Sequence, residues 1–373
     1  MFGSQYAGRR VFVTGHTGFK GFWLITWLLE LGAKVAGYAL DPPSDPSGFS
    51  ALALEKRIRH TQGDVRNRAA LAAAMAAFEP EAVFHLAAQP LVRHSYEDAP
   101  LTFESNAIGT LNLLEAVRAT PSVKALVLVT SDKCYQNDEW VFGYRETDRL
   151  GGRDPYSASK ACAEIIVHSY YHSFFSGAPL LATVRAGNVI GGGDWATDRI
   201  VPDCARAWAA GMPARIRSPH ATRPWQHVLE PLSGYLWLGA LLLQGQRERM
   251  GLPLHGEAFN FGPAADVVAP VGDLVKALGA YWPGFSLEID APHRDGKAES
   301  TLLKLCCDKS LAHLGWKATL SFEECVRFTA EWYLRFYGDS RPLATRLQAM
   351  YDYSVQQISA YCAQAEKGKQ PWL

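Results

Sequence analysis

The spacing of hydrophobic and polar residues predicts strands that alternate with helices over the first half of the chain. Short apolar runs bounded by turns are typical of buried strands, and longer one-sided patterns are typical of helices. The predicted strands are residues 11–13, 34–39, 82–86, 125–130 and 181–185, and the predicted helices are residues 18–31, 67–78, 101–120 and 156–174. Alternating strands and helices build parallel sheets that are covered on both faces. We therefore expect an α/β fold with a doubly wound parallel sheet.

The pattern changes after Arg185. Residues 187–194 are rich in glycine, residues 215–225 gather proline, tryptophan and arginine, and later strand and helix signals are shorter and mixed. We expect residues 1–185 to form the sheet domain and residues 186–373 mainly a smaller second domain, with residues 227–245 packing back on the sheet. The stretch from residue 322 is predicted to be helical, and residues 367–373 are expected to fray.

Charge and composition exclude several classes of protein. The 373 residues carry 37 Lys and Arg against 37 Asp and Glu, so no net charge attracts nucleic acid or an anionic membrane. The longest apolar run, residues 236–243, is too short to cross a bilayer. The 7 cysteines have no metal-ligand spacing and read as reduced. With no signal peptide before the first strand, we expect a cytoplasmic protein without metal, nucleic-acid or membrane partners.

A glycine-rich loop joins the first strand to the first helix. Gly15 allows a tight turn, Gly18 lets a diphosphate approach the backbone, and Gly21 lets the helix pack closely on the sheet. This strand–turn–helix context predicts a Rossmann-type dinucleotide site, although the G-x-x-G-x-x-G spacing is one residue longer than the common fingerprint. The predicted cofactor-binding loop is Gly15, His16, Thr17, Gly18, Phe19, Lys20 and Gly21, in which His16 is interpreted as a packing residue.

Two acidic positions indicate which dinucleotide binds. One follows the second predicted strand, and the other follows a further short strand that ends before residue 64. Asp41 follows the second strand, where an acid is expected to bind the adenosine ribose hydroxyls. Its charge would repel a 2′-phosphate, and no Lys or Arg lies between residues 36 and 50, so we favour NAD over NADP. The alternative for Asp41 is a turn before Pro42. Asp64 and Val65 either contact adenine or form a turn.

Tyr156 and Lys160 stand four residues apart on a predicted helix and therefore share one face. A phenol beside a fixed positive charge is expected to have a lowered pKa and to take a proton from an alcohol near neutral pH. Ser131 follows a predicted strand whose carboxyl end faces the ligand crevice. Together with the glycine loop, these residues predict oxidation of a hydroxyl group by a nicotinamide cofactor.

Ser131, Tyr156 and Lys160 resemble the Ser/Thr-Tyr-Lys triad of the extended short-chain dehydrogenase/reductase family, and the resemblance covers nearly the whole chain. It also includes the glycine loop and the further cofactor-binding candidates Leu86, Ala87, Ala88 and Asn106. Within the family, residues 130–135, 185–195 and 223–231 are similar to the 4,6-dehydratases that act on CDP-glucose. Those enzymes have Asp-Lys after the triad hydroxyl, as here, whereas dTDP-glucose dehydratases have Asp-Glu.

The resemblance implies NAD-dependent conversion of CDP-glucose to CDP-4-keto-6-deoxyglucose. Tyr156 would take the proton of the sugar 4-hydroxyl as hydride leaves C4 for NAD, with Ser131 hydrogen-bonding that oxygen and Lys160 holding the cofactor ribose. Asp132 is placed to protonate the leaving 6-hydroxyl, for which it must carry a proton. Lys133 is the candidate for the C5 proton, or else a solvated or phosphate-facing charge, because a lysine base must first lose its own proton. Hydride then returns to C6.

Cationic residues are needed for the substrate diphosphate, and arginine suits phosphate oxygens. By resemblance, Arg223 is the first candidate, followed by Asn188, Arg199 and Arg93. Glu299 matches a family His-Glu segment and is a candidate to close the site. Cytosine specificity depends on the resemblance alone.

The helices predicted at residues 101–120 and 156–174 carry apolar residues around much of their circumference. By resemblance such helices pair across a homodimer, while burial within one subunit is the alternative. Two other functions are alternatives. A nucleotide-sugar 4-epimerase shares the triad but has no need of Asp132 and Lys133, and a non-catalytic NAD sensor has no need of the intact Tyr156–Lys160 pair.

Overall fold

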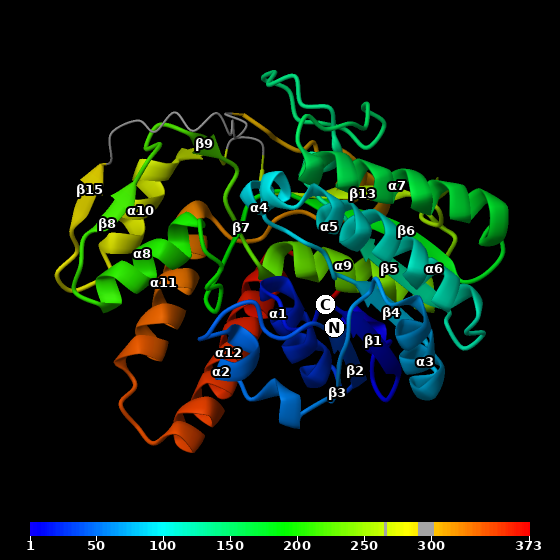
Figure 1. Cartoon of the computed structure of the whole chain (residues 1–373), viewed down its shortest axis with the longest axis horizontal. Helices are drawn as coiled ribbons and strands as arrows, with labels where there is room; N and C mark the ends of the chain where they lie inside the picture. The colour runs from blue at the N-terminus through cyan, green and yellow to red at the C-terminus, as the bar shows by residue number, and fades with distance from the viewer. Residues whose placement is uncertain (265–266, 290–301) are drawn as a thin grey trace.

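Seven parallel strands form one central sheet in the order β13-β6-β5-β4-β1-β2-β3 (Figure 1). The computed structural model describes residues 1–264, 267–289 and 302–373. The strands are β1 (Arg10–Thr14), β2 (Lys34–Ala39), β3 (Arg59–Gln62), β4 (Ala82–His85), β5 (Ala125–Val129), β6 (Leu180–Ala186) and β13 (Ala258–Phe261). Strand order reverses between β1 and β4, as in doubly wound sheets, so the predicted α/β fold class is confirmed.

Successive residues of β1, β4 and β5 enter different hydrophobic clusters, one on each face of the sheet. Val11 and Val13 of β1 join one cluster, whereas Phe12 between them joins the other. Both faces are therefore covered, which is why the strands read as continuous apolar runs. The covering helices are α1 (Phe19–Glu30) and α9 (Leu229–Leu243) on the first face, and α3 (Arg68–Phe78), α6 (Gly109–Arg118) and α7 (Pro155–Phe174) on the second (Figure 1).

Helix α9 is buried along its whole length and packs against β5 and β6. A helix that is hydrophobic around its circumference belongs in a core. Although α9 follows the first elements of the second lobe in sequence, it covers the sheet beneath the strand ends that carry the candidate triad.

The second lobe, at the left of Figure 1, is built from short elements between β6 and α11. Within it β8 pairs with β15 and β9 pairs with β14. Its elements are β7 (Val189–Ile190), α8 (Ile200–Ala209), β8 (Ala214–Ile216), β9 (Thr222–Arg223), β10 (Gln226–His227), β14 (Ala269–Pro270), α10 (Val271–Gly279) and β15 (Leu287–Ile289). The remaining helices and strands are α2 (Gly48–Ala51), α4 (Val92–Glu97), α5 (Ala99–Phe103), β11 (Glu248–Arg249), β12 (Leu252–Pro253), α11 (Phe322–Gly338) and α12 (Leu343–Lys367).

The helix predicted at residues 101–120 is interrupted. The wider π-turn η3 (Glu104–Ile108) separates α5 from α6. Asn106 lies within η3, and its amide group accepts a hydrogen bond from Gln89 N at 2.8 Å and donates one to Ser159 Oγ at 2.9 Å. The break thus turns a polar side chain toward α7, the helix that carries Tyr156 and Lys160, and such π-turns often occur at functional sites.

The chain end is fixed in place, so the fraying expected for residues 367–373 is wrong. Trp372 is buried, stacks on Phe2 with ring centroids 5.0 Å apart, and meets Trp27 edge to face. Both chain ends therefore lie together beneath α1 (Figure 1). In the described residues, no helix combines the length and apolar character that a membrane span requires.

Candidate active site

The glycine loop lies against the end of β4, at the point where strand order reverses. Gly15 has φ of 72°, and a Cβ added there would lie 2.5 Å from Ala87 N. A Cβ on Gly21 would lie 2.3 Å from Gly15 O, so only glycine allows α1 to start so close to the loop. Gly18 is the N-cap residue of α1, next to the helix's first amides. The loop therefore fits a dinucleotide diphosphate, and Leu86 and Ala87 lie directly beside Gly15.

A chain of hydrogen bonds joins β1, β4 and η3 beneath this loop. Thr14 Oγ1 lies 2.7 Å from His85 Nδ1, and His85 Nε2 lies 3.2 Å from Thr110 Oγ1. Thr110 in turn donates to the carbonyl of Asn106 at 2.7 Å. Burial, with a smaller effect of the Lys160 charge, lowers the pKa of His85 to about 3. His85 is thus a neutral core histidine that holds the loop in register.

Two of the predicted cofactor-binding side chains, His16 of the loop and Asp41 after β2, differ in exposure. His16 is buried against Phe49 and His60, with its Nε2 2.7 Å from His60 Nδ1. Burial and the neighbouring His60 lower the pKa of His16 to about 3, so its ring packs in the core rather than facing a ligand. Thr17 Oγ1 donates to Leu40 O at 3.0 Å. Asp41 is exposed just beyond β2, and its carboxylate accepts from Gln62 at 2.7 Å.

Asp64 and Val65 take positions that fit the turn alternative. The Asp64 carboxylate accepts from the guanidinium and backbone of Arg66, with the shortest contact at 2.6 Å. Partial burial raises the pKa of Asp64, but the hydrogen bonds and charge of Arg66 outweigh it and leave the pKa below the ordinary value. Val65 is buried, and its carbonyl accepts from Asn112 at 3.0 Å.

The predicted catalytic strand end forms a short turn, η4 (Asp132–Cys134), capped by Ser131. Ser131 Oγ donates to Asp132 Oδ1 at 3.0 Å and accepts from Lys133 N at 3.2 Å. Asp132 is buried, and a Cβ on Gly187 would lie 3.2 Å from its other carboxylate oxygen. Lys133 is half-buried. The structure therefore places a hydroxyl and a carboxyl group side by side, facing the start of the second lobe.

Helix α7 brings Tyr156 and Lys160 to the same place. Asp154 caps the helix by accepting from Ser157 N at 2.9 Å, and Pro155 occupies the first turn. Tyr156 and Lys160 are both buried, and Lys160 Nζ lies 3.5 Å from Val129 O. The Ser131 hydroxyl is close enough to the Tyr156 phenol to lower its pKa. The three triad candidates are thus brought together from β5 and α7.

The lowered phenol pKa expected from the Lys160 neighbour is wrong for this structure. Burial raises the pKa of Tyr156 to about 12, and the Ser131 hydrogen bond and the Arg199 charge offset only part of that effect. Burial also lowers the pKa of Lys160 to about 8. Sequence spacing places the two side chains on one face but says nothing about how far water is excluded from them.

Lys20 is partly buried near the charged side chains around the triad and does not lie on the surface of the loop. Its Nζ lies 5.9 Å from the ring centre of Tyr235 on α9. Burial lowers the pKa of Lys20 to about 8, and the charges of Asp132, Arg199 and Lys160 also act on it. No pattern in the sequence predicts this contact, because Tyr235 is far away along the chain.

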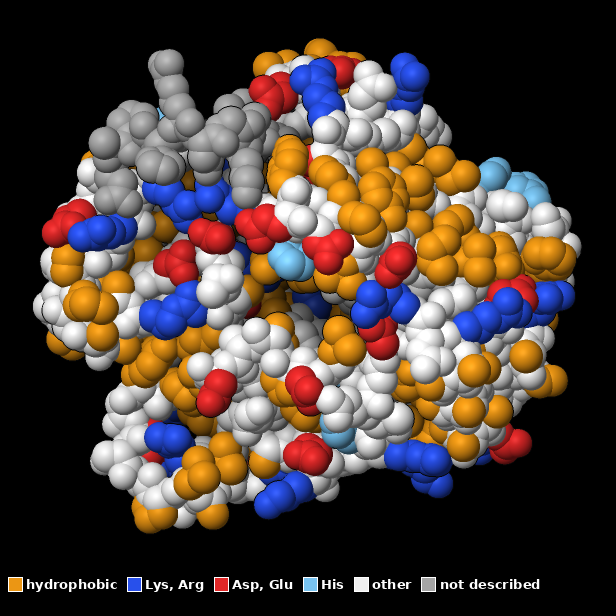
Figure 2. Space-filling view, viewed as in Figure 1, with side chains coloured by type: hydrophobic (Ala, Val, Ile, Leu, Met, Phe, Trp, Pro, Cys, Tyr) orange, Lys and Arg blue, Asp and Glu red, His pale blue; other side chains and the backbone are white. Residues whose placement is uncertain are grey.

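The candidates for the substrate diphosphate are dispersed over the second lobe and α4. Arg199 forms an ion pair with Asp194 at 2.9 Å, and Arg223 on β9 donates to Thr222 O at 2.9 Å. The carbonyl of Asn188 accepts from Gln226 at 3.3 Å, and Arg93 is half-buried on α4. Glu299 lies outside the described residues. Figure 2 shows a hollow at the centre of this face, between the two lobes, with basic side chains in its depth.

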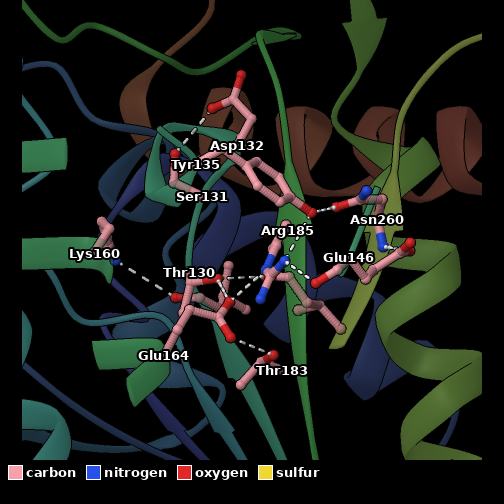
Figure 3. A network of polar contacts seen from close by, with 12 residues as sticks. Thr130, Ser131, Asp132, Tyr135, Glu146, Lys160, Glu164, Thr183, Arg185 and Asn260 are labelled. Carbon is pink, nitrogen blue, oxygen red and sulfur yellow. Dashed lines mark hydrogen bonds and ion pairs between the residues drawn. The ribbon is translucent and has the colours of Figure 1, made fainter. Parts of the chain in front are cut away.

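Sequence reasoning missed a polar network directly behind the triad (Figure 3). Glu164 accepts from Arg185 Nε at 2.7 Å and from Thr183 at 2.8 Å, and Arg185 also donates to the Tyr135 hydroxyl at 2.7 Å. Tyr135 donates to Asn260 at 2.8 Å. The available signal was Glu164 itself, a charged residue one turn after Lys160 on a helix face that meets the sheet. No cluster of three metal-ligating side chains occurs within the described ranges.

Comparison with known proteins identifies the family. The GDP-mannose 4,6 dehydratase family matches residues 12–329. The chain belongs to this family.

Two dehydratases and one solved epimerase structure are similar to this chain over most of its length. The CDP-glucose 4,6-dehydratase of Salmonella typhimurium is 43% identical over 93% of this chain and 97% of its own. A dTDP-glucose 4,6-dehydratase of Xanthomonas campestris is 26% identical over 86% of this chain and 92% of its own. The NAD complex of Thermus thermophilus UDP-glucose 4-epimerase has a TM-score of 0.70 at 27% identity, covering 87% of this chain and 98% of that one.

Proposed function

We propose that this chain is an NAD-dependent dehydratase that converts CDP-glucose into CDP-4-keto-6-deoxyglucose. The proposal is supported by the 43% identity to a CDP-glucose 4,6-dehydratase over 93% of the chain. The observation that carries it is the buried carboxyl group of Asp132, hydrogen-bonded to the triad hydroxyl of Ser131 at 3.0 Å. An epimerase of the same family needs the hydroxyl but not an acid beside it.

Some residues of the chain bind the dinucleotide, and others transfer protons to and from the sugar. When bound, NAD supplies the site that accepts hydride from the sugar and later returns it. The amides at the start of α1 hold its diphosphate, Asp41 binds the adenosine ribose, and Lys160 binds the second ribose. Tyr156 Oη takes the proton of the sugar 4-hydroxyl, and Ser131 Oγ keeps that oxygen in line with it.

Elimination of water then uses the end of β5. The 4-ketone acidifies the C5 hydrogen, for which Lys133 is the candidate base. Asp132 donates its proton to the departing 6-hydroxyl, so that water leaves and a C5–C6 double bond forms. Hydride return to C6 with protonation at C5 gives the 4-keto-6-deoxy sugar, so the overall reaction is redox-neutral.

The proposed reaction is tested by incubating the purified protein with CDP-glucose and NAD and following the product by mass spectrometry. We expect loss of one water from the nucleotide sugar and a carbonyl at C4. dTDP-, UDP- and GDP-glucose serve as matched substrates and should turn over more slowly. A product with the mass of CDP-glucose but inverted at C4 would identify an epimerase instead.

Asp132→Asn separates the two halves of this reaction, because it removes the acid while keeping a side chain of the same shape. We expect C4 oxidation to continue and water elimination to slow by about 10²-fold or more. Reduced nicotinamide should then accumulate, which its absorbance measures. Equal slowing of oxidation and elimination would remove Asp132 from the acid role.

We also infer that the working form is a homodimer. Ile108 on η3 and Ile165 and Phe174 on α7 are 47%, 57% and 51% exposed. Figure 2 shows a hydrophobic area at its upper right, over the region of α5, α6 and α7. A second copy placed on the same helices would cover this area. The free cysteines support a reducing compartment, and we infer a cytoplasmic location.

A further inference from the structure

A buried carboxylate lies directly behind the triad and takes no part in the proposed reaction steps. Glu164 follows Lys160 by one turn of α7, and its side chain is 5% exposed, as is that of its ion-pair partner Arg185 at 4%. A buried ion pair is seldom more stable than apolar side chains of the same volume. Stability alone therefore gives no reason for a charge at this position.

The hydrogen bonds of Glu164 connect the two elements that carry the triad. One oxygen accepts from Arg185 Nε at 2.7 Å and from Thr130 Oγ1, and the other accepts from Thr183 Oγ1 at 2.8 Å (Figure 3). Thr130 directly precedes Ser131 at the end of β5. A single carboxylate therefore fixes the strand end of Ser131 against the helix of Tyr156 and Lys160.

Charges around Lys160 come from several elements. Lys20 on α1 is a second cation, and His85 on β4 is neutral because its pKa is about 3. Burial raises the pKa of the Cys134 thiol on η4, and burial also raises the pKa of the Tyr156 phenol, so both stay neutral near pH 7. Among the groups that act on Lys160, Glu164 is thus the one that carries a full negative charge.

We propose that Glu164 is a positioning residue for the dehydratase. Its negative charge keeps the Lys160 ammonium protonated in a buried site, and its hydrogen bond to Thr130 sets Ser131 in line with Tyr156. Arg185 is the counter-charge that lets the carboxylate stay ionised. The catalytic part of this inference rests on the proposed function, whereas the effect on Lys160 does not.

The pKa shifts of Glu164 and Lys160 agree with these roles. Burial raises the pKa of Glu164, but the charge of Arg185 and three hydrogen bonds outweigh burial and hold the pKa below its ordinary value. Burial lowers the pKa of Lys160 to about 8, with Cys134 and Glu164 opposing the change. Because the Cys134 thiol is neutral near pH 7, Glu164 is the group whose negative charge raises the pKa of Lys160 at that pH.

The test is a titration of Lys160 in the full chain without nucleotide, by NMR of carbon-13-labelled lysine, with the signal assigned by Lys160→Met. The double variant Glu164→Gln/Arg185→Met removes both charges and leaves no buried ion unpaired. We expect its Lys160 midpoint to fall about one pH unit or more below that of the wild type. Thr183→Val is the matched control, because it removes a hydrogen bond to Glu164 without changing charge, and its midpoint should stay within a few tenths of a unit.

Kinetics give a second measurement. With CDP-glucose, kcat of the double variant should fall about 10-fold or more while KM changes little, because Glu164 touches no substrate group. If the double variant does not fold, Glu164→Asp withdraws the charge by one bond and should lower the Lys160 midpoint in the same direction.

An unchanged Lys160 midpoint in a folded variant, or an equal fall in Thr183→Val, would overturn the proposal. Absence of CDP-glucose turnover in the wild type would instead contradict the proposed function, and the midpoints would still decide the role of Glu164.

Discussion

The Tyr156 phenol shows how far single side chains can be understood from sequence. Its partners could be predicted, because residues four apart on a helix share a face and Ser131 ends a neighbouring strand. Its acidity could not, since burial raises the pKa to about 12 and the charge nearest in sequence does not dominate. A further positive charge, such as that of the nicotinamide ring of bound NAD, is therefore needed before the phenol acts as a base near neutral pH.

Tyr156→Phe is expected to lower turnover by about 10²-fold or more, because it removes only the proton-accepting oxygen. The ring fits the same buried space, so the melting temperature should change little. Tyr170→Phe is the control on the same helix, since the Tyr170 hydroxyl donates to Glu115 away from the triad. Steady-state kinetics measure both variants, and a Tyr156→Phe enzyme with wild-type kcat would exclude the phenol as the base.

At the scale of elements, helices and strands with strong local signals were predicted well. The helix predicted at residues 156–174 agrees with α7 (Pro155–Phe174), and β1 and β2 agree closely with their apolar runs. The break at η3 was not predicted, because it depends on a hydrogen bond that Asn106 accepts from Gln89 and one that it donates to Ser159, and only the fold brings these residues together. The Glu164 network was missed for the same reason.

Helix α9 contains a carboxyl group whose titration should couple stability to pH. Glu230 accepts hydrogen bonds from Thr319 N, Leu320 N and Tyr361 Oη at 2.6–3.0 Å. Burial nevertheless raises its pKa to about 7. A folded-state pKa above the unfolded value means that its stabilising contribution is complete below about pH 4 and is lost as pH rises through about 7.

Glu230→Gln should remove this dependence, so the variant's melting temperature should change less than that of the wild type between about pH 5 and pH 8. Thermal unfolding followed by circular dichroism at each pH measures the effect. Glu331→Gln is the control, because that carboxylate is partly exposed on α11 in an ion pair with Arg327. Parallel pH curves for wild type and Glu230→Gln would contradict the assignment.

At the scale of the whole molecule, the joined chain ends stabilise the fold. Trp372 is buried against Phe2, Trp27 and Tyr361. Trp372→Ala should lower the free energy of unfolding by about 3–5 kcal/mol, as for other large core truncations. The neighbouring Leu373→Ala should change it by less than about 0.5 kcal/mol, because Leu373 is 42% exposed. Denaturant unfolding compares them, and equal effects would show that the last turn is not part of the core.

The proposed homodimer leads to a prediction at the same scale. Ile165→Arg together with Ile108→Arg places charges in the exposed apolar area and should convert a dimer into a monomer with an unchanged circular dichroism spectrum. Light scattering after size-exclusion chromatography measures the mass. Met250→Arg, at an exposed position on a different part of the surface, should leave the mass unaltered. A wild-type protein that is already monomeric would refute the dimer.

The placement of β13 and α9 has a consequence for biosynthesis. The sheet receives its last strand from residues 258–261, and the apolar underside of β5 and β6 stays bare until residues 229–243 arrive to shield it. While the ribosome is still synthesising the intervening lobe, the nascent polypeptide exposes both an unpaired edge of the sheet and a hydrophobic surface. A chain truncated near residue 185 would therefore be incompletely folded and prone to aggregation, and it would not form an independent nucleotide-binding domain.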